Sequence, residues 1–226
     1  MFIDRILEII YPTRCVSCGK DGSLLCESCA GEIEPSGGYF CVVCGKATLG
    51  GFTHKTCTTR YTPERTLSGF AYKGPARELV KVLKYRRVRK AADVLAALLV
   101  KDLQDRGVSF GPKSLVVPIP LSFWRKNTRG FNQASLLAKA VADTLKLEFR
   151  EGALKRVKDT PSQVSLNRKE RARNIQGSFS AGEDLDGKDI LLVDDVLTTG
   201  ATVREAAKAL KKTGAGLVWV LSFARD

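Results

Sequence analysis

The sequence predicts an α/β protein in which a mainly parallel central sheet is flanked by helices, with a small cysteine-rich module at the N-terminus. The apolar run Ile190–Val193 has no polar alternation, which is typical of a strand buried on both faces. A polar loop and a helical pattern follow it, and strand and helix patterns also alternate earlier in the chain. All seven cysteines and the single histidine lie between Cys15 and Cys57, which sets that segment apart.

The composition is compatible with a packed globular core, since hydrophobic residues make up 44% of the chain. No apolar run approaches ~20 residues, so we expect no membrane span. The first residues, Met1–Tyr11, mix apolar with charged side chains, which argues against a signal peptide. We expect a short amphipathic helix that packs on the protein itself, with a membrane-surface helix as the alternative.

The net charge of +13 is concentrated in the middle of the chain. Residues 64–182 carry 25 basic and 10 acidic side chains, whereas residues 1–63 carry 6 of each and residues 183–226 carry 6 and 8. Such an excess favours a phosphate-rich partner, either a pyrophosphorylated sugar or a nucleic-acid backbone. A basic surface that only keeps the protein soluble is the alternative.

The cysteine-rich segment has the spacing of a metal-binding module. Its candidate ligands form four pairs with two residues between the members, and these are Cys15 and Cys18, Cys26 and Cys29, Cys41 and Cys44, and His54 and Cys57. Eight such ligands suit two structural Zn²⁺ ions. The odd number of cysteines argues against a disulfide framework, and four pairs in so short a segment argue against a redox motif.

Two questions about this module stay open at the level of sequence. Sequential pairing gives one all-cysteine site and one site with three cysteines and His54, whereas interleaved pairing gives a cross-braced module. His54 is either a ligand or a solvated side chain.

Between the module and the signature strand we expect several elements in order. Thr62-Pro63 suggests a boundary, so residues 1–62 form the module and residues 63–226 the main domain. A strand at Thr66–Tyr72 and helices at Ala76–Tyr85 and Ala91–Leu103 follow. The basic run Lys84–Lys90 either tracks a nucleic-acid backbone, with its tyrosine stacking on a base, or is a solvated loop.

A short buried strand is predicted at Leu115–Ile119, followed by a polar loop over residues 122–134 and a helix to about Lys146. The loop offers Arg125, Lys126 and Arg129 at the carboxyl end of a strand, where they suit a pyrophosphate. The last strand of the sheet is expected at residues 217–222.

The segment at residues 190–203 combines two carboxylates, which repel anions, with a loop and helix start that attract them. Asp194 and Asp195 end the buried run, and they can accept hydrogen bonds from paired hydroxyls or hold Mg²⁺. The loop at Gly200 leads into a helix over residues 203–213, whose start offers free N–H groups to a phosphate. A ligand with a terminal phosphate, a vicinal diol and a metal-bound pyrophosphate satisfies both, and 5-phosphoribosyl-1-pyrophosphate (PRPP) is such a ligand.

Residues 193–202 resemble the binding motif of type I phosphoribosyltransferases. The resemblance implies the type I phosphoribosyltransferase fold, with Asp194 and Asp195 on the ribose hydroxyls and Mg²⁺ bound with PRPP. It places around the 5-phosphate Thr198, Thr199, Gly200, Ala201 and Thr202, and Arg125 and Arg129 complete the predicted PRPP site. An ordinary buried strand with an aspartate-rich turn is the alternative.

A narrower resemblance covers nearly the whole chain. Pro118–Ser122, Arg129–Ala134 and the cysteine-rich start together resemble the ComF/GntX family of phosphoribosyltransferase-like competence proteins. The resemblance implies a cytoplasmic protein, or one held at the inner face of the membrane, that acts in DNA uptake, natural transformation or DNA utilisation. The partners it implies are PRPP and a competence DNA-translocation helicase, and the basic middle of the chain and the zinc module suit single-stranded DNA as a further partner.

The basic segment at residues 160–175 is similar to the flexible flap of type I enzymes. Its polar candidates for closing over a pyrophosphate are Gln163, Arg168, Arg171 and Asn174, and we expect Arg171 to join Asp194 and Asp195 in catalysis. A basic surface helix is the alternative.

Purine-salvage members of this superfamily carry an aspartate where this chain has Thr198, which cannot accept a proton at neutral pH. Purine salvage is therefore disfavoured. Two functions remain, a phosphoribosyltransferase whose acceptor is unidentified, and a single-stranded nucleic-acid binding protein that senses PRPP without turnover.

Overall fold

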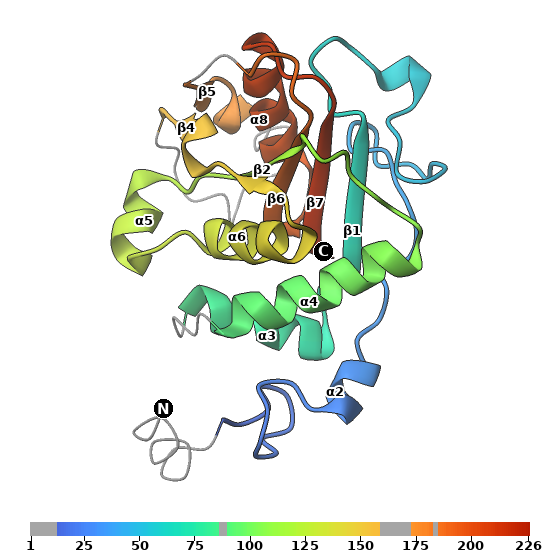
Figure 1. Ribbon diagram of the computed structural model, residues 1–226, viewed down its shortest axis with the longest axis vertical. Coiled ribbons are helices and arrows are strands. Elements are labelled where there is room, and N and C mark those ends of the chain that lie inside the picture. Colours follow the sequence, from blue (N-terminus) through green and yellow to red (C-terminus); the bar gives the residue numbers. More distant parts are fainter. Residues whose placement is uncertain (1–12, 86–89, 159–172, 183–184) are drawn as a thin grey trace.

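A computed structural model describes residues 13–85, 90–158, 173–182 and 185–226. Its centre is a five-stranded parallel sheet with the strand order β1-β7-β6-β2-β3 (Figure 1). The strands are β1 (Arg65–Ala71), β2 (Leu115–Pro118), β3 (Glu148–Phe149), β6 (Ile190–Leu197) and β7 (Val218–Arg225). The predicted fold class, a mainly parallel sheet flanked by helices, is confirmed.

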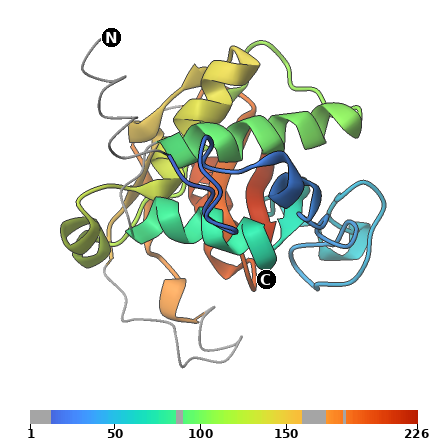
Figure 2. The same cartoon turned by 90° about the horizontal axis from the view of Figure 1, so that it is seen from below.

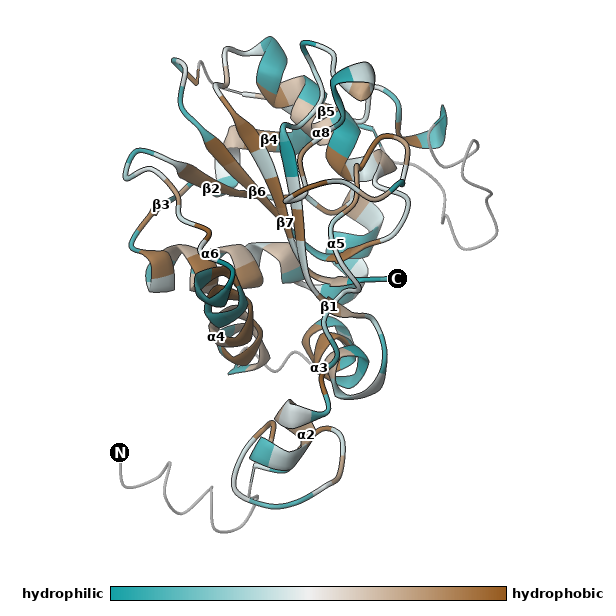
Figure 3. Cartoon of the chain, turned by 90° about the vertical axis from the view of Figure 1, so that its right-hand side faces the viewer, coloured by the Kyte–Doolittle hydropathy of each residue, from teal (hydrophilic) through white to brown (hydrophobic). Residues whose placement is uncertain are grey.

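Both faces of the sheet are covered, which explains the unbroken apolar run in β6. Leu191 and Val193 belong to the cluster shared with the helices α3 (Gly74–Tyr85), α4 (Lys90–Asp105) and α6 (Gln133–Leu145). Ile190 and Leu192 point the other way, into the cluster shared with α8 (Ala201–Lys212). Successive strand residues face opposite sides, so both sides must be apolar here (Figure 3).

A small two-stranded sheet accompanies α8 on the second face. It consists of β4 (Leu154–Arg156) and β5 (Phe179–Ala181), which pair antiparallel. The short helices are α2 (Glu27–Gly31), α5 (Phe123–Arg129), and the 3₁₀ turns η1 (Lys55–Cys57) and η2 (Glu151–Ala153).

Two sequence-based expectations are corrected by the structure. The polar segment expected as a loop contains α5, because Ser122 caps its start by accepting a hydrogen bond from the Arg125 N–H at 3.4 Å and Gly130, with φ 75°, ends it. The strand expected to end at the aspartates continues through Leu197, because its backbone still pairs with β7 there.

The N-terminal module covers the free edge of β1. Pro35 pairs antiparallel with Phe70, and Phe52 pairs antiparallel with Arg65. The Ser36 N–H donates to Gly69 O at 3.0 Å, and the Thr66 N–H donates to Gly51 O at 2.8 Å. An edge strand with unpaired N–H and C=O groups invites unwanted pairing, and the module occupies those groups. These hydrogen bonds join residues before and after residue 62. A domain boundary at residue 62 remains our proposal.

The first half of the module packs on the helices instead. Val16, Leu24 and Ile33 contact the buried cluster formed with α3 and α4, and Figure 2 shows this part of the chain crossing those helices. The expected N-terminal helix at residues 1–11 lies outside the described residues. Among the helices that the structure describes, none has the length and hydropathy that a membrane span requires.

Candidate functional site

A pocket of about 270 Å³ opens where the parallel strands end. It is lined by residues that directly follow β1 and β2, by the end of β6 and by the residue after β7. The charged and polar members are Tyr72, Lys84, Arg125, Arg129, Gln133, Arg156, Asp194, Asp195, Thr198, Thr202 and Asp226. Ligands of open α/β sheets bind at the carboxyl ends of the strands, so the pocket lies where this fold places a site.

The two adjacent aspartates have different surroundings. Asp195 is 4% exposed, and its Oδ2 lies 3.2 Å from Lys84 Nζ without a hydrogen bond among the described residues. Asp194 accepts a hydrogen bond from the Asp195 N–H at 2.9 Å. Burial and the neighbouring charge of Asp195 raise the pKa of Asp194 to about 7, although Lys84 and Arg125 oppose the shift. Asp194 can therefore change its charge near neutral pH.

Lys84 has a more specific place than the sequence indicated. We expected it in a basic run on a nucleic-acid backbone or in solvent, but it lies in the last turn of α3 with a side chain only 16% exposed. Its spacing from Val80 and Leu83, which are both buried, is the helical signal that could have placed it on the inner face. Residues 86–89 of that run lie outside the described residues.

The predicted phosphate loop divides into two parts. Thr198 and Thr202 line the pocket, whereas Thr199 and Gly200 form the turn between them and Ala201 is the first residue of α8. Gly200 has φ 72°, a left-handed conformation that favours glycine, and it is the N-cap residue of α8. Because glycine caps without a side chain, the N–H groups of the first turn can receive an anion.

The segment after β2 delivers three groups to the pocket. Gly130 ends α5 and Asn132 begins α6, where its amide also donates to Ile119 O at 3.0 Å. By capping α6 and binding Ile119 O, Asn132 orients the next residue, Gln133. Gln133 is 5% exposed, and its Oε1 has no hydrogen-bond partner among the described residues. Arg125 and Arg129 line the same pocket, and the Arg129 guanidinium lies 5.3 Å from the centre of the Tyr85 ring.

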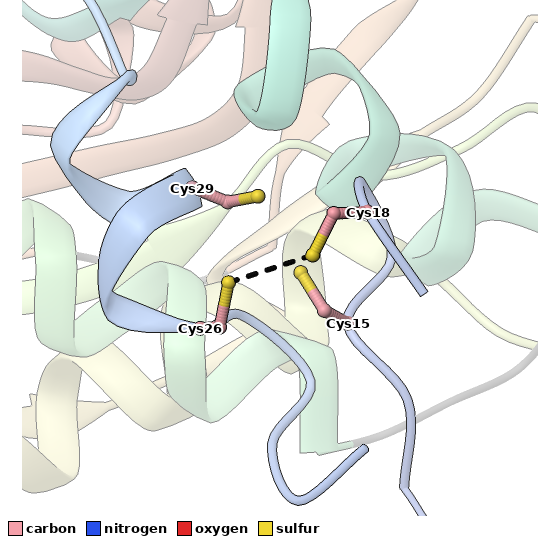
Figure 4. Close-up of side chains that lie close together, drawn as sticks. All are labelled: Cys15, Cys18, Cys26 and Cys29. Atoms are coloured by element: carbon pink, nitrogen blue, oxygen red, sulfur yellow. Dashed lines mark hydrogen bonds between the residues drawn. The ribbon is translucent and has the colours of Figure 1, made fainter. Parts of the chain in front are cut away.

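The candidate metal ligands form two compact clusters by sequential pairing. Cys15, Cys18, Cys26 and Cys29 form the first, which Figure 4 shows with the four thiols facing one another. Cys41, Cys44, His54 and Cys57 form the second. In each cluster all four ligand atoms lie within 4.8 Å of one another. Both donor sets fit a closed tetrahedral Zn²⁺ site, which leaves no position for chemistry.

The histidine faces its cluster with one ring nitrogen. His54 Nδ1 lies 3.4 Å from Cys44 Sγ, and Nε2 lies 3.0 Å from the backbone oxygen of Ala47. A zinc-binding histidine commonly donates its other N–H to a carbonyl, which fixes the ring orientation. The arrangement fits His54 as a ligand through Nδ1.

The two clusters begin with the same turn. The sequences Cys15–Lys20 and Cys41–Lys46 differ at one residue, and the Gly19 N–H donates to Cys15 O as the Gly45 N–H does to Cys41 O. Burial opposes ionisation of Cys15 and Cys41, but hydrogen bonds from backbone N–H groups, in the turns and at Cys26 and His54, outweigh it and lower the pKa of each thiol to about 6. Each turn therefore favours the thiolate that zinc requires.

Not every predicted residue reaches the pocket. Gln163, Arg168 and Arg171 lie outside the described residues, so their assignment to a flap and the catalytic role of Arg171 remain predictions. Asn174 is described, and it is not among the residues that line the pocket. Sequence reasoning missed Arg156, because an arginine in a short strand outside the recognised motifs gives no signal.

Two protein-family models match the chain. They are the phosphoribosyl transferase domain, over residues 128–224, and the double zinc ribbon domain, over residues 6–59. The chain thus carries the zinc module that the cysteine spacing predicted.

Several curated proteins are similar over most of their length. The DNA utilization protein YhgH of Salmonella typhi is 34% identical over 164 residues, which cover 72% of each chain. Its Escherichia coli K12 counterpart is 31% identical over 222 residues, covering 89% of this chain and 96% of that protein. Competence protein F of Haemophilus influenzae is 29% identical over 225 residues, covering 94% of this chain and 96% of that protein. Among solved structures, adenine phosphoribosyltransferase from Thermoanaerobacter pseudethanolicus matches at 16% identity with a TM-score of 0.38, over 62% of this chain and 83% of that chain.

Proposed function

Because the chain belongs to the ComF/GntX family of phosphoribosyltransferase-like proteins, we propose that it binds PRPP and Mg²⁺ in the pocket at the carboxyl ends of β2 and β6. We propose further that it transfers the phosphoribosyl group in DNA uptake or DNA utilisation, since relatives are named as competence and DNA utilization proteins.

One observation carries this proposal. A single pocket combines carboxylates, hydroxyls at a helix start and three arginines, and PRPP needs all three kinds of group. Arg125, Arg129 and Arg156 are suited to the pyrophosphate. Thr198 and Thr202 stand at the start of α8, where the helix dipole and free N–H groups favour the 5-phosphate.

The acidic pair is suited to the ribose. The Asp194 carboxylate can accept hydrogen bonds from the vicinal hydroxyls, and its negative charge stabilises the positive charge that builds on the ring as the bond to pyrophosphate breaks. Lys84, which lines the same pocket, pairs with Asp195 and so holds that carboxylate in place. The arginines bind the departing pyrophosphate, and the transfer requires the acceptor to be held in line with the breaking bond.

The pocket also fits Mg²⁺. Gln133 Oε1 is a buried oxygen atom without a hydrogen-bond partner among the described residues, and the Asp194 carboxylate in the same pocket adds further oxygen ligands, whereas Asp195 Oδ2 is already paired with Lys84. Magnesium prefers such oxygen ligands together with phosphate oxygens. When bound with PRPP, the ion would neutralise charge on the leaving pyrophosphate.

Calorimetric titration with PRPP and Mg²⁺ tests the proposal. We expect binding by the wild type and at least tenfold weaker binding by Asp194→Asn, since a charge-assisted contact contributes roughly 1.5–3 kcal/mol. Asp143→Asn, on the exposed part of α6, is the matched control and should bind as the wild type does. Absence of binding by folded, zinc-loaded protein would refute the proposal.

A specific surface supports the second candidate, single-stranded nucleic-acid binding without turnover. Tyr85, Phe123 and Trp124 are 69%, 69% and 70% exposed, and the basic residues Lys126 and Arg129 lie beside them on α5. Exposed aromatic rings between cations suit stacked bases and a phosphate backbone.

The two candidates differ in one product, because the transferase alone releases pyrophosphate. A coupled pyrophosphate assay with single-stranded DNA as acceptor separates them. Binding of a labelled oligothymidine that falls in Trp124→Ala, with no pyrophosphate release from PRPP, would favour the second candidate.

A further inference from the structure

The second cysteine turn touches the phosphate loop directly. A Cβ placed on Gly200 would lie 2.5 Å from Val42 Cγ2 and 3.2 Å from Val42 O, so the two backbones approach as closely as glycine allows. Val42 is 2% exposed and stands next to Cys41 in the turn that provides two ligands of the second cluster. The zinc module therefore packs directly against the loop that precedes α8.

Other contacts connect the same turn to the same loop. Val42 belongs to the buried cluster that contains Leu197, Ala201 and Val203, the apolar residues on either side of the loop. Phe40, just before the turn, lies under the Arg225 guanidinium at 3.6 Å, and Arg225 pairs with Leu197 across β6 and β7. The turn therefore shares a buried cluster with the apolar residues on both sides of the loop, and the residue just before the turn contacts β7 beside the strand that enters the loop.

The first cysteine turn offers a natural comparison. Val16 is the counterpart of Val42 in the matching sequence, but it packs against the cluster formed with α3 and α4. The two turns have the same backbone hydrogen bonds and nearly the same sequence, yet the loop contacts described here involve the second turn.

Glycine can adopt many backbone conformations besides the left-handed one. Contacts with neighbouring residues are therefore needed to hold the loop in the conformation that presents its N–H groups. We propose that the second metal cluster is a positioning element for the phosphate loop, in which Val42 holds Gly200 in the conformation that binds an anion. The inference rests on the proposed function in one respect, that this loop binds the 5-phosphate of PRPP.

The matched substitutions Val42→Ala and Val16→Ala test the inference in the full-length, zinc-loaded protein. Hydrogen exchange of the backbone amides at residues 198–202, measured without ligand, should speed up by about tenfold in Val42→Ala and stay unchanged in Val16→Ala. Both variants should keep the zinc content of the wild type. The dissociation constant for PRPP and Mg²⁺ should rise by about tenfold in Val42→Ala alone.

This design separates the two hypotheses. If the wild type does not bind PRPP, the proposed function fails, while faster exchange at residues 198–202 in Val42→Ala still supports the positioning role. If hydrogen exchange at residues 198–202 is as slow in Val42→Ala as in the wild type, the positioning role is wrong. It is also wrong if Val16→Ala speeds up this exchange equally, whether or not the protein binds PRPP.

A second comparison removes one ligand from each cluster. Cys44→Ser and Cys18→Ser should each lower the zinc content, and Cys44→Ser should cause the larger increase in exchange at residues 198–202. An equal increase in both would contradict the inference. Because a ligand substitution can prevent folding, the valine pair remains the primary test.

Discussion

Lys84 Nζ lies 3.2 Å from Asp195 Oδ2, which joins the last turn of α3 to the end of β6 across the floor of the pocket. Both side chains are largely buried, with 16% and 5% exposed. The pair therefore couples the stability of the fold to the shape of the site, because neither charge can be removed without leaving the other uncompensated.

Lys84→Met should lower the free energy of unfolding by about 3 kcal/mol, since it leaves the Asp195 charge buried and unpaired. Lys81→Met is the control on the same helix, and it removes a more exposed pair with Glu78, so it should cost less than about 1 kcal/mol. Urea unfolding measures both. Equal losses in the two variants would mean that the buried pair contributes no more than an exposed one.

The stability of the protein should fall as the pH rises through 7. An acid whose pKa is higher in the folded state binds its proton more tightly when folded, so its stabilising contribution is complete below the unfolded value near 4 and is lost as the pH passes the folded value. For Asp194 that value is about 7. Urea unfolding at pH 5.5 and pH 8 should show a larger loss for the wild type than for Asp194→Asn, and parallel curves would contradict the shift.

Binding of PRPP with Mg²⁺ should change in the opposite direction. The ionised Asp194 accepts hydrogen bonds and attracts a cation better than the neutral acid, so affinity should increase between pH 6 and pH 8. Asp194→Asn controls for the titration of the ligand itself. The informative quantity is the ratio of the two dissociation constants, and a ratio that does not vary with pH would exclude a role for Asp194 ionisation.

Gly200→Ala should destabilise the protein by about 2–3 kcal/mol, because it combines strain at φ 72° with a contact to Val42 that is too short. Gly187→Ala is the matched control, since Gly187 also has a positive φ of 66° but has no atom within 4 Å of the added Cβ. Its cost should be about 1 kcal/mol, from backbone strain alone.

The double variant Gly200→Ala/Val42→Ala refines this prediction. Removing Cγ2 of Val42 relieves the shortest contact, so thermal unfolding should show less than the sum of the two single losses. Strict additivity would indicate that the strain at Gly200 is independent of the cysteine turn.

The sequence contained the fold class, the metal ligands and the signature strand because each leaves a local pattern. The unbroken apolar run in β6 predicts a doubly covered strand, and the spacing of the cysteines indicates metal binding. The helix α5 was not expected, because a helix this short depends on its caps, Ser122 and Gly130, which are also ordinary loop residues.

The contacts that assemble the site were not visible in the sequence, because they join distant segments. Lys84 meets Asp195 only after α3 has packed beside the sheet, and Val42 meets Gly200 only after the module has docked. Spacing along the chain defines a metal cluster, but it carries no information on which neighbouring loop the cluster will touch.

The strand order has a consequence for how the chain reaches this structure during synthesis. Strand β1 pairs with β7, so the first strand of this sheet waits for its last one, and Arg65 meets Trp219 only after every residue between them has been synthesised. The cysteine module precedes β1 and covers its other edge, so it can protect the waiting strand from pairing with other chains. Metal uptake early in synthesis would then limit aggregation of the growing chain.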